Sequence, residues 1–157
     1  MDRKERLRFL LRERQVEPWR ERLRDVLTRF NVPVVLVTPP EADPMLEVIL
    51  DHWDEVRDDP CRETHADVAS AAMTVTARLS AAAGEIWVLP GPEPHVGVVR
   101  LQQPPETDLV ASLIAWNREG CIFYDVAGSH IVLADYLDGA VEVQTPRETG
   151  EIRDGST

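Results

Sequence analysis

The sequence CIFYDVAGSHIVLADYLDGAVEVQT (residues 121–145) contains three short segments with the composition of β-strands. CIFYDV, HIVLADY and AVEVQT are rich in the β-branched and aromatic side chains that strands favour. The connecting segments AGS and LDG supply the glycine, serine and aspartate that suit tight turns. Three consecutive strands with such short connections predict an antiparallel meander at the end of the chain.

Two further strands and two helices are expected just before the meander. EIWVLP (residues 85–90) and HVGVVRL (residues 95–101) read as strands joined by a proline-glycine turn. One helix is expected at residues 107–118, after a pair of prolines. A longer, Ala-rich helix is expected at residues 64–83, with Thr64 as its N-terminal cap. Together with the meander, this region predicts a five-stranded sheet.

The N-terminal region adds helices and one more candidate strand. Apolar spacing predicts helices at residues 2–16 and 18–30, with a break at Glu17-Pro18. VPVVLVT (residues 32–38) is uninterrupted and β-branched, so it reads as a buried sixth strand for which a parallel orientation is one option. A helix over residues 44–57 follows, because Pro39-Pro40 ends the strand and the apolar spacing becomes helical.

The expected order of elements is α-α-β-α-α-ββ-α-βββ. This order predicts the α+β class, with a mostly antiparallel sheet of five or six strands and helices packed on one face. Residues 1–145 are expected to form a single α+β domain, in which residues 1–30 are a basic helical N-terminal arm or helix pair. Residues 146–157 have little to bury and are expected to form a flexible acidic tail.

Charge is distributed unevenly over the 157 residues. The net charge is −11 overall, +4 over residues 1–30 and −15 over residues 31–157. Because an acidic body repels phosphates, we expect no nucleic acid on the main domain. The composition favours a basic protein partner or cations, and it is equally typical of acid that serves only solubility.

The sequence predicts a cytoplasmic protein without a membrane partner. Residues 1–14 are charged and lack the apolar region of a signal peptide. No apolar segment approaches the roughly 20 residues that span a bilayer. Cys61 and Cys121 form no C-x-x-C pattern and are expected to stay reduced. Sixteen arginines against one lysine suggest a GC-rich bacterial gene.

Metal and cofactor motifs are not found. Residues 50–67, LDHWDEVRDDPCRETHAD, hold seven carboxylates, two histidines and a cysteine. His52, Cys61 and His65 match no zinc spacing, and the oxygen pattern and central glycine of an EF-hand loop do not occur. Prolines follow VVLVT where a phosphate-binding turn needs glycines. We therefore predict no metal and no cofactor.

A catalytic set has little support from the sequence. Cys121 and His130, with Asp125 or Asp135, would make a Cys-His-Asp arrangement. A cysteine at the start of a strand is more often a small buried residue, and no G-x-S-x-G segment surrounds it. Any chain with 28 acidic residues contains carboxylate pairs, so their abundance identifies no glycosidase. We predict no catalytic residues and favour a protein that is not an enzyme.

The clearest surface feature is one acidic helix face, here called the acidic ridge. Its residues are Glu47, Asp51, Asp54, Glu55, Asp58 and Asp59. On a helix over residues 44–57, this face lies opposite an apolar stripe that includes Leu50 and Trp53. Like charges at i and i+4 cost about 0.2–0.5 kcal/mol each, and acid late in a helix opposes the macrodipole. Coverage by the chain's own arginine-rich helices, coverage by a basic partner, and a role in solubility are the three open explanations.

The leading hypothesis is a non-enzymatic, acidic protein-binding module of the bacterial cytoplasm. It would use the acidic ridge to capture a basic protein, since complementary charge speeds association and desolvated aromatic side chains supply affinity. An immunity or antitoxin-like protein that blocks a cationic toxin fits the size, the charge and the lack of motifs.

Two other hypotheses remain. The alternative is a small enzyme or small-ligand-binding protein with a pocket between the C-terminal meander and the helices. Its expected wall residues are His95, Cys121, Tyr124 and His130. A further expectation is a homo-oligomer formed through the N-terminal helices. Its exposed apolar stripe would consist of Leu7, Leu10 and Leu11.

Overall fold

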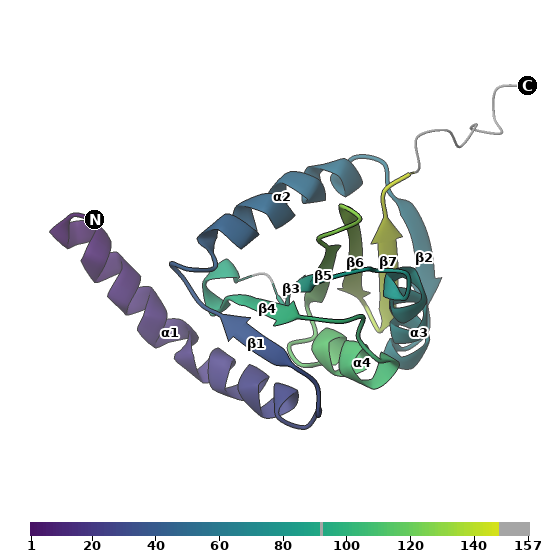
Figure 1. Cartoon of the computed structure of the whole chain (residues 1–157), viewed down its shortest axis with the longest axis horizontal. Coiled ribbons are helices and arrows are strands. Elements are labelled where there is room, and N and C mark those ends of the chain that lie inside the picture. The colour runs from purple at the N-terminus through teal and green to yellow at the C-terminus, as the bar shows by residue number, and fades with distance from the viewer. Residues whose placement is uncertain (92, 148–157) are drawn as a thin grey trace, which may run out of the picture.

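The computed structural model describes residues 1–91 and 93–147, and Figure 1 shows how they fold. The helices are α1 (Arg3–Leu27), α2 (Asp43–Arg57), α3 (Val68–Leu79) and α4 (Thr107–Ala115), with a short 3-10 helix η1 (Pro94–Val96). The strands are β1 (Val34–Val37), β2 (Cys61–His65), β3 (Ile86–Leu89), β4 (Val98–Leu101), β5 (Gly120–Asp125), β6 (His130–Leu137) and β7 (Ala140–Thr145). Most of the expected acidic tail lies outside the described residues.

The described strands form one antiparallel sheet in the order β1-β4-β3-β5-β6-β7-β2. The α+β class and the meander β5-β6-β7 are confirmed, and the sheet has seven strands rather than the expected five or six. β1 is antiparallel to β4, so the parallel option was wrong. It is also an edge strand of the described sheet, and the side chain of Val35 is 50% exposed.

The strand β2 was not predicted from the sequence, where a helix was expected from Thr64 onward. The segment CRETH forms the edge strand beside β7, in the register that pairs Cys61 with Thr145 and His65 with Val141. Its side chains are mostly polar, as solvent-exposed edge strands allow, so no apolar alternation marks it. α3 starts later than predicted, and its N-cap is Asp67, whose carboxylate accepts a bond of 2.7 Å from the Ser70 amide.

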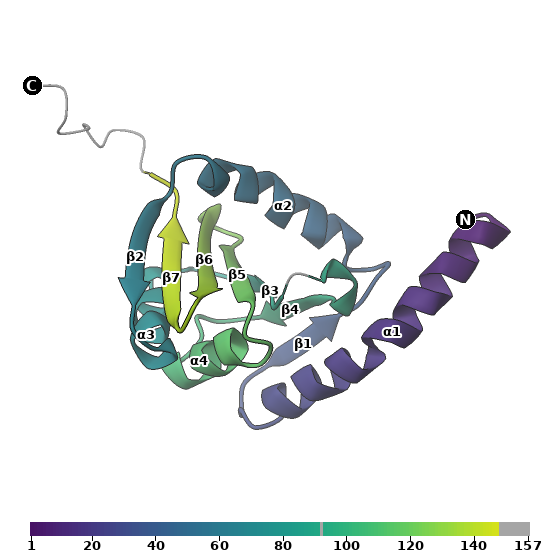
Figure 2. The same ribbon diagram turned by 180° about the vertical axis from the view of Figure 1, so that it is seen from behind.

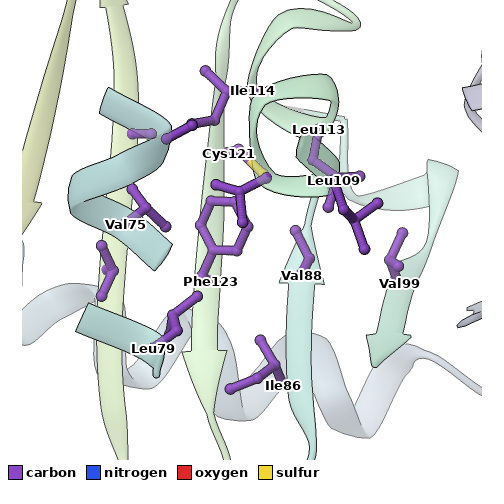
Figure 3. Packing of buried hydrophobic residues seen from close by; sticks show 14 of the residues in the cluster. Val75, Leu79, Ile86, Val88, Val99, Leu109, Leu113, Ile114, Cys121 and Phe123 are labelled. Atoms are coloured by element: carbon purple, nitrogen blue, oxygen red, sulfur yellow. The ribbon is translucent and has the colours of Figure 1, made fainter. Parts of the chain in front are cut away.

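The sheet is covered on both faces, so the expectation that the helices pack on one face was wrong. Phe123 points into a core formed with α3, α4 and α1. Figure 3 shows the part of this core between the sheet, α3 and α4. Its neighbour Tyr124 points the other way, into a second core under α2. Successive side chains of a strand alternate between faces, so apolar residues at both positions require a cover on each side. Figures 1 and 2 show α2 on one side of the central strands and α3 with α4 on the other.

α1 is one continuous helix, so the predicted break at Pro18 was wrong. Pro18 lies inside α1, and the helix continues for nine more residues to Leu27. A proline removes one intrahelical bond, and this loss is tolerable because Pro18 lies on the exposed side of the helix. Val16, Leu23 and Leu27 are buried on the other side, and they straddle the proline. The packing of this apolar stripe on the body therefore outweighs the tendency of Pro18 to end the helix.

α1 is anchored to the body by Arg20, which is only 2% exposed. Its guanidinium donates to the backbone oxygens of Val96 at 3.0 Å and His95 at 2.5 Å, and to the carboxylate of Glu13. The Nε2 of His95 lies 2.8 Å from the same carboxylate. Arg20, with a smaller contribution from His95, lowers the pKa of Glu13. This cluster holds the middle of α1 against η1.

Replacing Arg20 with alanine should lower the free energy of unfolding by about 2–3 kcal/mol, since a hydrogen bond from a charged group contributes about 1.5–3 kcal/mol. The variant also leaves two backbone oxygens near η1 without their donor. The control is Arg24→Ala, which removes an exposed ion pair with Glu17 and should change stability by less than about 1 kcal/mol. Urea unfolding followed by circular dichroism measures both. Equal losses for the two variants would contradict the anchoring role of Arg20.

Candidate functional site

α2 has three distinct sides, and together they make the candidate site. One side packs on the sheet, where Leu46, Ile49 and Val56 are buried. The acidic ridge lies on the opposite side of the helix. Between the two lies a flank formed by Leu50 and Trp53. Leu50 is 39% exposed and Trp53 is partly buried, so the prediction that both belong to the core stripe was only partly right.

All six residues of the acidic ridge are exposed. Arg57 lies 3.3 Å from the carboxylate of Asp54 and 3.6 Å from that of Asp58, and Arg147 lies 3.1 Å from that of Asp59. The guanidinium of Arg57 also stacks over the Trp53 ring, at 5.8 Å from its centroid. Within the described part of the chain, no ion pair reaches the other ridge carboxylates, which are Glu47, Asp51 and Glu55.

The arginine-rich helix α1 does not cover the acidic ridge. α1 runs beside β1 and η1, and Figures 1 and 2 show it apart from α2. The ion pairs of its arginines are made with Glu13, Glu17 and Glu93. One of the three explanations for the ridge is thereby removed, because the chain's own N-terminal helix does not neutralise it.

A cavity of about 320 Å³ lies beside the acidic ridge, between α2 and the sheet. Leu50 and Trp53 form its wall on α2, and the facing wall comes from β3, β5 and β6. The lining residues of the sheet side are Leu89, Gly120, Cys121, Ile122, Leu133, Ala134 and Asp135, and Gly91, Pro94 and Glu119 complete the rim. The volume lies at the lower end of the range for small-ligand sites, about 300–1,000 Å³. The walls are mainly apolar.

Two carboxylates face this cavity, and one of them is in an unfavourable environment. Glu119 is exposed at the rim, whereas Asp135 is partly buried. Asp135 stands directly opposite the buried Glu142 in the β6–β7 register. Burial, and then the negative charge of Glu142, raise the pKa of Asp135. A carboxyl group that resists ionisation therefore lines the cavity, and Arg62, 3.8 Å from the Glu142 carboxylate, offsets part of the neighbouring negative charge.

The two histidines of residues 50–67 lie in different places in the fold, and the buried Nε2 of His65 has no hydrogen-bond partner among the described residues. His52 places Nδ1 2.9 Å from the backbone oxygen of Val48 and Nε2 3.4 Å from the hydroxyl of Tyr124. His65 packs at the edge of the sheet beside Glu63, with 3.4 Å between its Nε2 and the carboxylate. Among the described residues, no three His, Cys, Asp or Glu side chains come together in a group that could hold a metal ion.

The wall residues that the alternative hypothesis expected do not converge. His95 packs on α1 against Glu13 and the ring of Phe9. Cys121 pairs with Ala134 in the sheet, at the far end of β5 and β6 from His130, which pairs with Asp125. Burial raises the pKa of the Cys121 thiol, which keeps it neutral and unreactive. A Cys-His-Asp arrangement is therefore not assembled, and of the expected wall residues only Cys121 lines the cavity.

Comparison with protein-family models, with curated proteins and with solved structures finds no match for this chain. In the described residues, no helix has both the length and the apolar character to span a membrane.

The environment of Asp135 predicts that Asp135→Asn stabilises the protein near pH 7. A carboxyl with a raised pKa resists ionisation in the folded state, so stability is lost as the pH rises from its ordinary value of 3.8 toward the raised value. The asparagine variant escapes this loss. Its advantage should therefore be present at pH 7 and vanish below about pH 3.5.

The measurement is the urea midpoint of both proteins across this pH range. Glu119→Gln is the control, because this exposed rim carboxylate should leave the midpoint unchanged. A variant that is less stable than the wild type at pH 7, or equally shifted at every pH, would show that Asp135 is not strained by burial and by Glu142.

Proposed function

We propose that this protein is a non-enzymatic binding module that captures a basic protein through the surface of α2. The observation that carries the proposal is the junction of the acidic ridge with the apolar cavity. Leu50 forms this junction, since it lines the cavity and has Glu47 and Asp54 as its neighbours at i−3 and i+4 on the helix surface. A basic segment with one apolar side chain would contact both parts at once.

Each part of the surface has a separate physical role in this proposal. The ridge attracts a cationic partner over a distance set by the ionic strength and thereby raises the association rate. The cavity takes an apolar side chain and removes it from water, which supplies affinity. The rim carboxylate Glu119 and the strained Asp135 favour a cation beside that side chain.

The cost of the ridge supports a role in binding. Glu47–Asp51, Asp51–Glu55 and Asp54–Asp58 are like-charge pairs at i and i+4, and each costs about 0.2–0.5 kcal/mol. Arg57 relieves only the last of these pairs. A basic partner would relieve the repulsion in all three pairs, and this relief would add to the free energy of binding.

The class of protein that fits this surface is a small immunity or antitoxin-like protein of the bacterial cytoplasm. Such a protein would block a cationic toxin by laying acidic side chains against the toxin's phosphate-binding residues. The size of the chain and its acidic charge support this assignment.

A second candidate function is the binding of a small organic cation. The specific observation that favours it is the cavity, whose volume and apolar walls suit a small molecule and whose carboxylate Asp135 suits an amine. In this case the ridge would contribute little, and affinity would be unchanged by substitutions on the outer side of α2.

The test compares two variants with equal changes in net charge. The ridge variant combines Glu47→Gln, Asp51→Asn and Glu55→Gln, and the control combines Glu21→Gln, Asp25→Asn and Glu106→Gln on other exposed surfaces. The probe is a short synthetic peptide of leucine and lysine with amphipathic helical spacing, titrated by calorimetry. We expect the ridge variant to bind at least about tenfold more weakly, a loss of about 1.4 kcal/mol, and the control to bind like the wild type.

The ridge variant should also be more stable than the wild type by about 0.5 kcal/mol, because two like-charge pairs disappear. Lost binding therefore cannot be attributed to unfolding. Equal affinities of the peptide for the two variants, or an affinity that is the same at low and high salt, would refute the proposal.

A further inference from the structure

The N-terminal half of α1 carries an apolar stripe that neither the fold nor the proposed function uses. Leu7, Leu10 and Leu11 are 58%, 54% and 53% exposed. They lie on the side of α1 opposite the residues that pack on the body, such as Phe9 and Val16. Figures 1 and 2 show that this end of α1 extends beyond the sheet.

The same face of α1 is positively charged. Arg3, Lys4 and Arg14 flank the leucines at i±3 and i±4 spacing, and all three are exposed. No ion pair is formed by these three cations within the described part of the chain. Residues 3–14 have a net charge of +4. The projecting segment, residues 3–14, is thus a basic amphipathic helix with an open apolar face.

A second projecting segment is a poor partner for this face. Pairing two copies of α1 through their leucines would bring two segments of charge +4 together, and like charges at such an interface oppose association. The acidic ridge and its flank have the complementary properties. Residues 47–59 have a net charge of −5, and the cavity lined by Leu50 and Trp53 offers an apolar recess beside them.

The projecting segment cannot reach α2 of its own chain in this fold. Arg20 holds the middle of α1 against η1, and Arg12 makes a bidentate contact with Glu93 at 3.0–3.1 Å. The T-shaped contact of Phe9 with His95, at 5.1 Å between ring centroids, anchors the segment nearer its start. The complementary surface must therefore belong to another molecule.

We propose that the projecting segment of one copy binds the α2 surface of a second copy, with its leucines at the cavity and its cations on the acidic ridge. This inference rests on the proposed function, because it names a partner for the same surface. Reciprocal exchange between two molecules closes a two-fold symmetric dimer, since each copy offers both a segment and a ridge. An external basic protein then competes with the second copy, and the dimer is a resting state that the partner opens.

The test is a complementation experiment on the full chain, with mass measured by sedimentation at low salt. The segment variant combines Leu7→Ser, Leu10→Ser and Leu11→Ser, which are exposed and leave the core intact. The ridge variant is the one described above. We expect the wild type to dimerise, with association weakened roughly tenfold or more at about 0.5 M salt. Each variant alone should be monomeric, and their mixture should form a heterodimer, because it restores one segment–ridge contact.

Three results would overturn the inference. The first is a wild type that stays monomeric at about 100 μM, a concentration at which weak complexes are populated. The second is a ridge variant that still dimerises, which would indicate pairing of α1 with α1. The third is a mixture of the two variants that remains monomeric. Circular dichroism of both variants confirms that they are folded.

The leucine–lysine peptide separates this inference from the proposed function. Peptide binding by a wild type that is monomeric would overturn the dimer and retain the function. In the opposite case, the wild type dimerises but the monomeric segment variant, whose ridge is free, does not bind the peptide. This result would support the dimer and would overturn the capture of other basic proteins.

Discussion

The central strands of the sheet carry apolar side chains on both faces, and burying both faces is the constraint that arranges the other elements. Phe123 and Tyr124 are neighbours on β5, yet one lies in the core under α3 and α4 and the other lies under α2. α2 is thereby fixed across the sheet by Ile49 and Val56. Because only one side of the helix is used for packing, its acidic side is held in water on a rigid element.

The sequence predicted the elements whose signals are local. Alternating apolar residues and turn residues predicted the meander, and the charge pattern predicted that the acidic ridge is one exposed helix face. The expected strand at 85–90 pairs with the expected strand at 95–101 as predicted, but the latter begins only at Val98, because residues 94–96 form η1. These features follow from the periodicity of a strand or helix, which a single sequence displays directly.

The features that were missed depend on contacts between distant segments. β2 exists because β7 offers an edge, and its polar sequence CRETH gives no sign of that neighbour. Continuity of α1 through Pro18 depends on the packing of Val16, Leu23 and Leu27 on the body, and Arg20 adds bonds to backbone oxygens 75 and 76 residues away. The cavity arises where Leu50 and Trp53 meet β5 and β6, and helical spacing alone places both residues in the core. Such pairings are set by the fold rather than by local propensity.

This architecture keeps the basic and acidic surfaces of the molecule apart. The basic projecting segment lies on one side, and the acidic α2 surface lies on another. The central claim is that α2 and its cavity form one binding surface. Chemical-shift mapping tests it most directly: the isotope-labelled chain carrying Leu7→Ser, Leu10→Ser and Leu11→Ser is titrated with the leucine–lysine peptide. We expect amide shifts confined to α2 and to the cavity walls at Leu89, Ile122 and Leu133. Shifts centred on α3 and α4, or none at saturating peptide, would contradict it.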